Sequence, residues 1–190
     1  MPVRPAFNPS STLQRLLDAP MRPGRLAWIG LRTARRGPIE VVEAAQLSPE
    51  AGLHGDRYGG RSGGKRQVTL IAREDLEAIG AFLGRDVALA PDLVRRNLVT
   101  EGLNLNALKG RCLAIGSDPA LAAIVEVTGE CHPCSRMEEV LGPGGYNALR
   151  GRGGLTARIL RAGVIRRGDL VALWDEDNPF AGSPLVDRAL

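Results

Sequence analysis

The chain has 190 residues, a formal net charge of +4 and a hydrophobic content of 44%. This length suits one domain with a buried core and room for a small appendage. No stretch approaches the roughly 18 apolar residues of a membrane span, and the first ten residues lack the apolar segment of a signal peptide. We therefore expect a cytoplasmic protein with no membrane partner.

Arginine supplies almost all of the positive charge, since only Lys65 and Lys109 are lysines. Arginine favours planar, bidentate contacts with anions. The chain has 4% aromatic residues and no recognisable nucleic-acid-binding motif, so we expect no nucleic-acid partner. Three cysteines are an odd count in a chain without an export signal, which favours reduced thiols over a disulfide framework.

The first 24 residues contain five prolines and predict an irregular N-terminal arm, residues 1–24. Within it, Ser11 can cap a short helix, with Gln14 three residues later as the capping-box partner. The apolar face of this helix consists of Leu13, Leu16 and Leu17.

Short runs rich in apolar and β-branched residues predict strands from Arg25 onward. They cover residues 25–32, 39–47, 67–71, 108–116 and 122–129, and residues 157–174 predict a strand, a turn and a last strand. Helical spacing of apolar residues appears at 73–83, and a second short helix is expected at 92–99, after Pro91.

Strands outnumber helices in this pattern, and many connections are too short for parallel crossovers. We therefore expect a mainly β, largely antiparallel and barrel-like domain with a few helices, spanning residues 25–175. The last residues, 176–190, are expected to form a C-terminal tail.

The segment ECHPCSRM (130–137) holds two of the three cysteines and one of the two histidines. Structural zinc usually needs four ligands from two such pairs, and no second pair exists, so we expect no zinc. A thioredoxin-like redox pair has the CxxC spacing but needs a strand leading into a helix in a βαβ unit. Pro143 and the two glycines after it leave little room for a long helix.

A single functional thiolate is the third interpretation, because a thiolate is both a soft metal ligand and a strong nucleophile. Arg136 lies two residues from Cys134 and would favour the anion. The alternative is that Cys134 is a small packed residue, as unpaired cysteines often are.

Two glycine-rich basic loops, 54–66 and 150–158, accompany the cysteines, together with RRN at 95–97. Glycine lets backbone N–H groups converge on an anion, and arginine adds bidentate contacts. Each loop alone is compatible with an ordinary hairpin. The combination fits a phosphorylated, anionic cofactor held beside a cysteine.

Seven motifs in order resemble the MOSC domain, which forms the C-terminus of molybdenum cofactor sulfurases and also occurs as small bacterial proteins. They are GDRY (55–58), QVTLI (67–71), RRNLV (95–99), LKGRCLAIG (108–116), VTGECHPC (127–134), GRGGLTARIL (151–160) and GVIRRGDLV (163–171).

The resemblance implies a β-barrel-like fold and binding of molybdenum cofactor, a phosphorylated molybdopterin. It makes Cys134 the ligand to molybdenum and places Asp56 in a motif near the pocket, and we expect Cys134 and Asp56 to be the catalytic residues. Two positions depart from familiar family forms. Tyr58 stands where GDRH has histidine, and Met137 stands where some reductase-branch relatives have a second cysteine.

Four further residues become cofactor contacts on this reading. Arg57, Arg95 and Arg158 would neutralise the cofactor phosphate, and Asn97 would hydrogen-bond the pterin or the phosphate. A buried dianion without such partners would be costly.

Three functions remain open at this stage. The first is an oxidoreductase that reduces N-hydroxylated or N-oxygenated small molecules with electrons from a donor protein. The second is a sulfur carrier that bears a persulfide on Cys134, loaded by a desulfurase partner. The third is a non-catalytic structural or interaction domain.

Overall fold

A computed structural model describes residues 11–17, 19, 21–58 and 64–174. The expected helix in the arm is present as α1 (Thr12–Leu17), and its three leucines are exposed. The predicted tail at 176–190 and the first ten residues lie outside the described part. Residues 59–63, within the first glycine-rich loop, also lie outside it.

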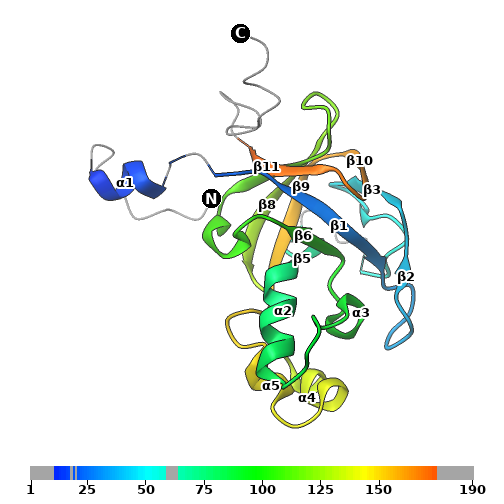
Figure 1. Ribbon diagram of the computed structural model, residues 1–190. Coiled ribbons are helices and arrows are strands. Elements are labelled where there is room, and N and C mark those ends of the chain that lie inside the picture. The colour runs from blue at the N-terminus through cyan, green and yellow to red at the C-terminus, as the bar shows by residue number, and fades with distance from the viewer. Residues whose placement is uncertain (1–10, 18, 20, 59–63, 175–190) are drawn as a thin grey trace.

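Seven strands close into a barrel, and this confirms the expected mainly β fold (Figure 1). In spatial order they are β1 (Gly24–Leu31), β6 (Leu98–Glu101), β5 (Val68–Ala72), β9 (Leu155–Arg161), β8 (Ala123–Glu130), β7 (Cys112–Ile115) and β11 (Leu170–Trp174). Pairing of β11 with β1 completes the circle. The pairing of β5 with β6 is parallel, and the other barrel pairings are antiparallel.

The run predicted as one strand at 39–47 is divided into β2 (Glu40–Val41) and β3 (Ala44–Ser48). The reason is a change of partner. β2 continues the hydrogen bonding of β1, whereas β3 leaves the barrel to pair with β10 (Gly163–Arg166) and β4 (Gly52–Leu53) in a second, three-stranded sheet.

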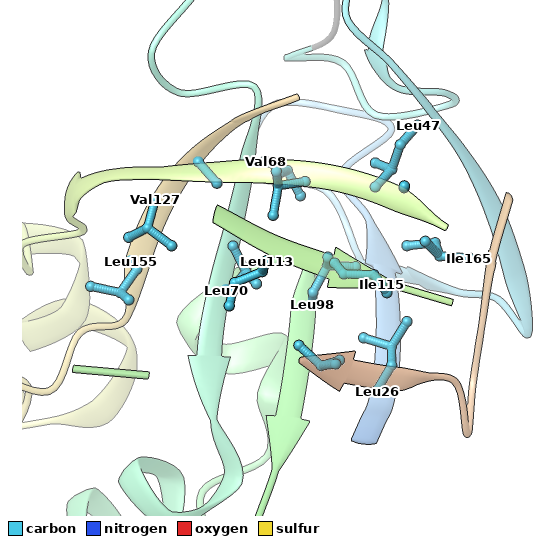
Figure 2. Close-up of a cluster of buried hydrophobic side chains, with 14 of the residues drawn as sticks. Leu26, Leu47, Val68, Leu70, Leu98, Leu113, Ile115, Val127, Leu155 and Ile165 are labelled. Atoms are coloured by element: carbon cyan, nitrogen blue, oxygen red, sulfur yellow. The ribbon is translucent and has the colours of Figure 1, made fainter. Parts of the chain in front are cut away.

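Alternate residues of the barrel strands point inward and form the main core (Figure 2). Leu26, Leu70, Leu98, Leu113 and Leu155 come from five different strands and have no exposed surface. Burial of such side chains is the main favourable contribution to folding. Successive side chains of a strand point to opposite faces of the sheet. Every second apolar residue of each strand therefore contributes to one closed interior.

A helical layer covers the outer face of β5 and β6, and Figure 1 shows its helices gathered on one side of the strands. It contains α2 (Arg73–Phe82), α3 (Pro91–Val94), α4 (Ser135–Leu141) and α5 (Gly145–Ala148). The 3₁₀ turn η1 (Leu105–Leu108) is not part of this layer, because its buried leucines pack in the barrel core. Within the described residues, no helix combines the length and apolar character needed to cross a membrane.

The helix expected at 92–99 is shorter than predicted. It ends at Val94, because Arg95 adopts the left-handed conformation with φ of 55° and the chain then enters β6. A left-handed residue is a common way for a helix to end. The structure therefore assigns RRN to a turn between a helix and a barrel strand.

Met137 lies in the apolar cluster of this layer, 4% exposed, with Ile71, Ile79, Val94 and Val99. Its thioether is thus surrounded by helical and strand side chains. A core methionine of this kind anchors α4 to the barrel wall.

We expect Met137→Ala to lower the free energy of unfolding by about 2–5 kcal/mol, as large-to-small substitutions in a core do. Urea denaturation followed by circular dichroism measures this change. Leu160→Ala is the matched control, because Leu160 is 43% exposed and a surface change stays within about 0.5 kcal/mol. Equal effects of the two substitutions would contradict the packing of Met137.

Candidate functional site

Asp56 is the centre of a buried polar network at the end of β1. Its Oδ2 accepts hydrogen bonds from the Arg32 backbone N and Nε, both at 2.8 Å, and its Oδ1 accepts from Arg32 Nη2 at 3.0 Å. The Tyr58 backbone N donates to Oδ1 at 2.9 Å, and the guanidinium of Arg32 lies over the Tyr58 ring, 5.7 Å from its centroid.

Asn97 extends the network across the barrel wall. Its Nδ2 donates to Asp56 Oδ2 at 2.8 Å and to the Gly30 carbonyl at 3.1 Å. Its Oδ1 accepts from Arg32 Nη2 at 2.9 Å, and from the backbone N and Oγ1 of Thr69 at 3.1 and 2.9 Å. Every polar atom of the Asn97 side chain is therefore used within the protein.

The pKa of Asp56 lies below its ordinary value. Burial of the carboxyl raises this pKa, but hydrogen bonds from the side chain and backbone of Arg32, the charge of Arg32 and the Tyr58 backbone N–H together outweigh burial. The carboxylate is thus held ionised as the counter-ion of Arg32.

These contacts give Asp56 and Asn97 a structural role, different from the contact with a ligand that the sequence predicted. The Asp56 carboxylate accepts five hydrogen bonds and its side chain has no exposed surface, so it positions Arg32 and faces no ligand. Asn97 is equally enclosed. Arg32 was not selected from the sequence, although a basic residue directly after an apolar strand is a signal that could have found it.

Arg95 connects the site to the loop between β1 and β2. Its Nη1 donates to the Gly37 carbonyl at 2.6 Å and its Nη2 donates to the Ala34 carbonyl at 3.3 Å. Among the described residues other than glycine, only Arg36, between these two carbonyls, and Arg95 itself have positive φ. Arg95 therefore holds this loop against the end of α3.

Four guanidinium groups lie close together here. Burial lowers the pKa of Arg95, and the charges of Arg136, Arg32 and Arg57 lower it further, while Asp56 acts in the opposite direction. We call Arg32, Arg57, Arg95 and Arg136 the arginine cluster. Two carboxylates pair with members of the cluster, Asp56 with Arg32 and Glu139 with Arg136. The four guanidinium groups still carry excess positive charge, so the cluster favours the binding of an anion.

Cys134 lies beside this cluster. It is exposed, directly precedes α4 and is two residues from Arg136. Cys131 is half-buried, and its carbonyl accepts from Nη2 of the buried Arg96 at 3.3 Å. Burial lowers the pKa of Arg96 and the charge of Arg32 lowers it further, while electrostatic interactions with Cys131 and Cys134 act in the opposite direction. Both cysteines are therefore close to this guanidinium.

Arg158, predicted as a fourth cofactor contact, lies elsewhere. Its side chain pairs with Glu126 on the neighbouring strand β8. In the described part of the chain, no hydrogen bond or ion pair connects Arg158 to the arginine cluster. The structure therefore brings together Asp56, Arg57, Arg95 and Asn97 but does not bring Arg158 to them.

The family model of the MOSC domain matches residues 53–172, more than half of the chain. The chain belongs to the MOSC domain family. The match begins just before Asp56 and includes both glycine-rich loops and both cysteines of the CHPC segment.

Solved structures of bacterial proteins share this fold. The YuaD protein from Bacillus subtilis matches with a TM-score of 0.69 and 16% identity, over 80% of this chain and 96% of that chain. YiiM from Geobacillus stearothermophilus matches with a TM-score of 0.62 and 17% identity, over 84% and 80% of the two chains. No curated protein matches the sequence significantly.

A metal bound by protein side chains alone does not fit the described residues of this MOSC domain, because they contain no group of three or more His, Cys, Asp or Glu side chains that could hold one. The donor set does fit a metal that arrives in an organic cofactor. Cys134 offers one exposed soft ligand, and the buried Nε of Arg136 has no hydrogen-bond partner among the residues that the structure describes. An anionic group would satisfy that donor.

The setting of the CHPC segment also differs from that of a thioredoxin. The strand before it, β8, is paired antiparallel with both of its neighbours, and the helix after it, α4, has seven residues. No βαβ unit surrounds the two thiols, in agreement with the reasoning from the sequence.

We expect Asp56→Asn to destabilise the protein at pH 7 by about 3–5 kcal/mol, because Arg32 would lose its buried counter-ion. The folded-state pKa of Asp56 is lowered from 3.8, so this stability is fully present above that value and is lost as the pH falls through the lower folded pKa. Urea denaturation at neutral and acidic pH measures it.

The free energies of unfolding of wild type and Asp56→Asn should therefore become similar at low pH. Asp92→Asn is the matched control, because Asp92 is exposed. A difference between wild type and Asp56→Asn that persists unchanged at acidic pH would contradict the role of the Asp56 charge.

Proposed function

We propose that this MOSC protein binds molybdenum cofactor at the arginine cluster, with Cys134 as the protein ligand to molybdenum. The observation that carries the proposal is the exposed Cys134 thiol beside guanidinium groups whose charges exceed the carboxylates among them. A thiolate is a soft ligand suited to a transition metal, and clustered arginines suit a phosphate.

Individual residues would contribute differently to cofactor binding. Arg57 is exposed, and its side chain donates no hydrogen bond within the described part of the chain, so it is available for the phosphate. Arg136 has an unused buried Nε. Arg95 and Arg32 are already engaged and would add positive potential, while Asp56 and Asn97 fix the position of Arg32.

The proposed reaction is the reduction of a small N-hydroxylated or N-oxygenated compound. When bound, the cofactor supplies the two-electron redox chemistry, and the protein supplies ligand, orientation and charge. A separate electron-donor protein would deliver the two electrons. Water is the second product, formed from the transferred oxygen and two protons.

A sulfur carrier is the second candidate, and the exposure of Cys134 favours it. An exposed thiol can accept sulfur from a desulfurase as a persulfide and pass it on. This function needs the same cysteine but requires no bound metal.

We expect wild type, purified from a host that makes molybdenum cofactor, to retain molybdenum, and Cys134→Ser to retain at least about tenfold less. Even residues that only support a metal ligand contribute this much to affinity. Elemental analysis by mass spectrometry gives the metal content per chain.

Cys112→Ser is the control, because it makes the same chemical change at a partly buried cysteine in β7, outside the CHPC segment. It should keep the wild-type metal content. Equal molybdenum in wild type and Cys134→Ser, or none in wild type, would contradict the ligand assignment.

The carrier function predicts one added sulfur on Cys134 after incubation with a cysteine desulfurase and cysteine. Peptide mass spectrometry locates that sulfur, and Cys134→Ser should show none. A wild type that stays unmodified while it binds molybdenum would exclude the carrier and leave the cofactor-binding proposal intact.

A further inference from the structure

Arg96 is a buried arginine that joins three segments far apart in the sequence. Its Nη1 donates to the Val94 carbonyl at 2.7 Å, its Nε to the Gly153 carbonyl at 2.6 Å and its Nη2 to the Cys131 carbonyl at 3.3 Å. These segments are the end of α3, the glycine loop (residues 151–154) and the cysteine loop (residues 131–134).

The charge of Arg96 has no carboxylate partner in the described part of the chain. The side chain is 7% exposed, and it forms hydrogen bonds only to backbone carbonyls. Burying a guanidinium in this way is costly unless its donors are satisfied. The planar fork of arginine can reach three carbonyls in fixed directions, which a lysine ammonium cannot do.

The glycine loop allows the three segments to meet. A Cβ on Gly153 would lie 2.2 Å from the Cys131 carbonyl oxygen, and a Cβ on Gly154 would lie 2.2 Å from the Leu70 carbonyl oxygen. Neither position has room for a side chain. The two backbones are therefore in contact at the point where Arg96 reaches both of them.

We infer that Arg96 is a positioning residue of the candidate site, which fixes the cysteine loop and thereby the place of Cys134 beside the arginine cluster. The Cys131 backbone is held on both sides, since its N donates to the Gly154 carbonyl at 2.8 Å and its carbonyl accepts from Arg96. Met137 in the core holds the other end of the segment. This role of Arg96 rests on the proposed function of Cys134 as the ligand to molybdenum.

The first test uses the full chain prepared without cofactor. In Arg96→Lys we expect Cys131 to be alkylated by iodoacetamide at least about fivefold faster than in wild type, because hydrogen bonds to a charged buried group are lost. Peptide mass spectrometry follows each cysteine separately. Cys112 is the internal reference for global unfolding, and the exposed Arg150→Lys is the matched control.

The second test uses protein loaded with molybdenum cofactor. If Cys134 is displaced, Arg96→Lys should lose the protein sulfur from the molybdenum coordination shell, as Cys134→Ser does. X-ray absorption measures this shell. Pterin content should stay near that of Arg150→Lys. The melting temperature should fall, because buried hydrogen bonds are lost, but the unfolding transition should stay cooperative and above the assay temperature, which global unfolding would not allow.

An alkylation rate of Cys131 that is unchanged in Arg96→Lys would overturn the inference. So would a molybdenum coordination shell that Cys134→Ser alters and Arg96→Lys does not.

If Cys134→Ser also leaves the coordination shell unchanged, the proposed function fails. The alkylation rate of Cys131 then still decides whether Arg96 fixes the position of the cysteine loop. Should Arg96→Lys not fold, Gly153→Ala perturbs the same junction, with Gly129→Ala as a control that meets only ordinary contacts.

Discussion

The buried ion pair between Arg32 and Asp56 is the interaction on which the candidate site depends. It joins the end of β1 to the segment after β4, and Asn97 extends it to β5 through Thr69. A carboxylate in this position would be costly without the bidentate guanidinium. Each partner neutralises the charge of the other. The ion pair therefore fixes the loops that carry Arg32 and Asp56 relative to the barrel.

The cluster itself is an arrangement of like charges. Burial and three neighbouring guanidinium groups all lower the pKa of Arg95, so the protein holds these groups together against their repulsion. Such repulsion falls when an anion binds. A cluster of this kind beside an exposed thiol supports the proposed binding of a phosphorylated cofactor whose metal takes a cysteine ligand.

The barrel and the helical layer have separate tasks in this arrangement. The closed interior fixes the strands from which Arg32, Asp56 and Asn97 extend, while the helices bring Cys134 to them. Met137 packs α4 against the barrel wall, and Arg96 holds the chain that precedes this helix. The position where some relatives have a second cysteine is thus used here for packing.

The sequence by itself determined the barrel class, most strands and the two basic glycine-rich stretches, because period-two apolar runs and short motifs are local signals. Cys134 was selected through the family resemblance, and its role as a ligand stays a prediction. The sequence did not determine the split between β2 and β3 or the early end of α3, because both follow from pairing with distant strands. Arg158 was grouped with the other arginines by sequence pattern, and its partner Glu126 on the neighbouring strand separates it from them.

Only the tertiary structure decided that Asp56 and Asn97 are enclosed, that Arg32 and Arg96 are central and that Met137 is buried. Each of those properties depends on which carbonyls, carboxylates and side chains the closed barrel places within hydrogen-bonding or packing distance.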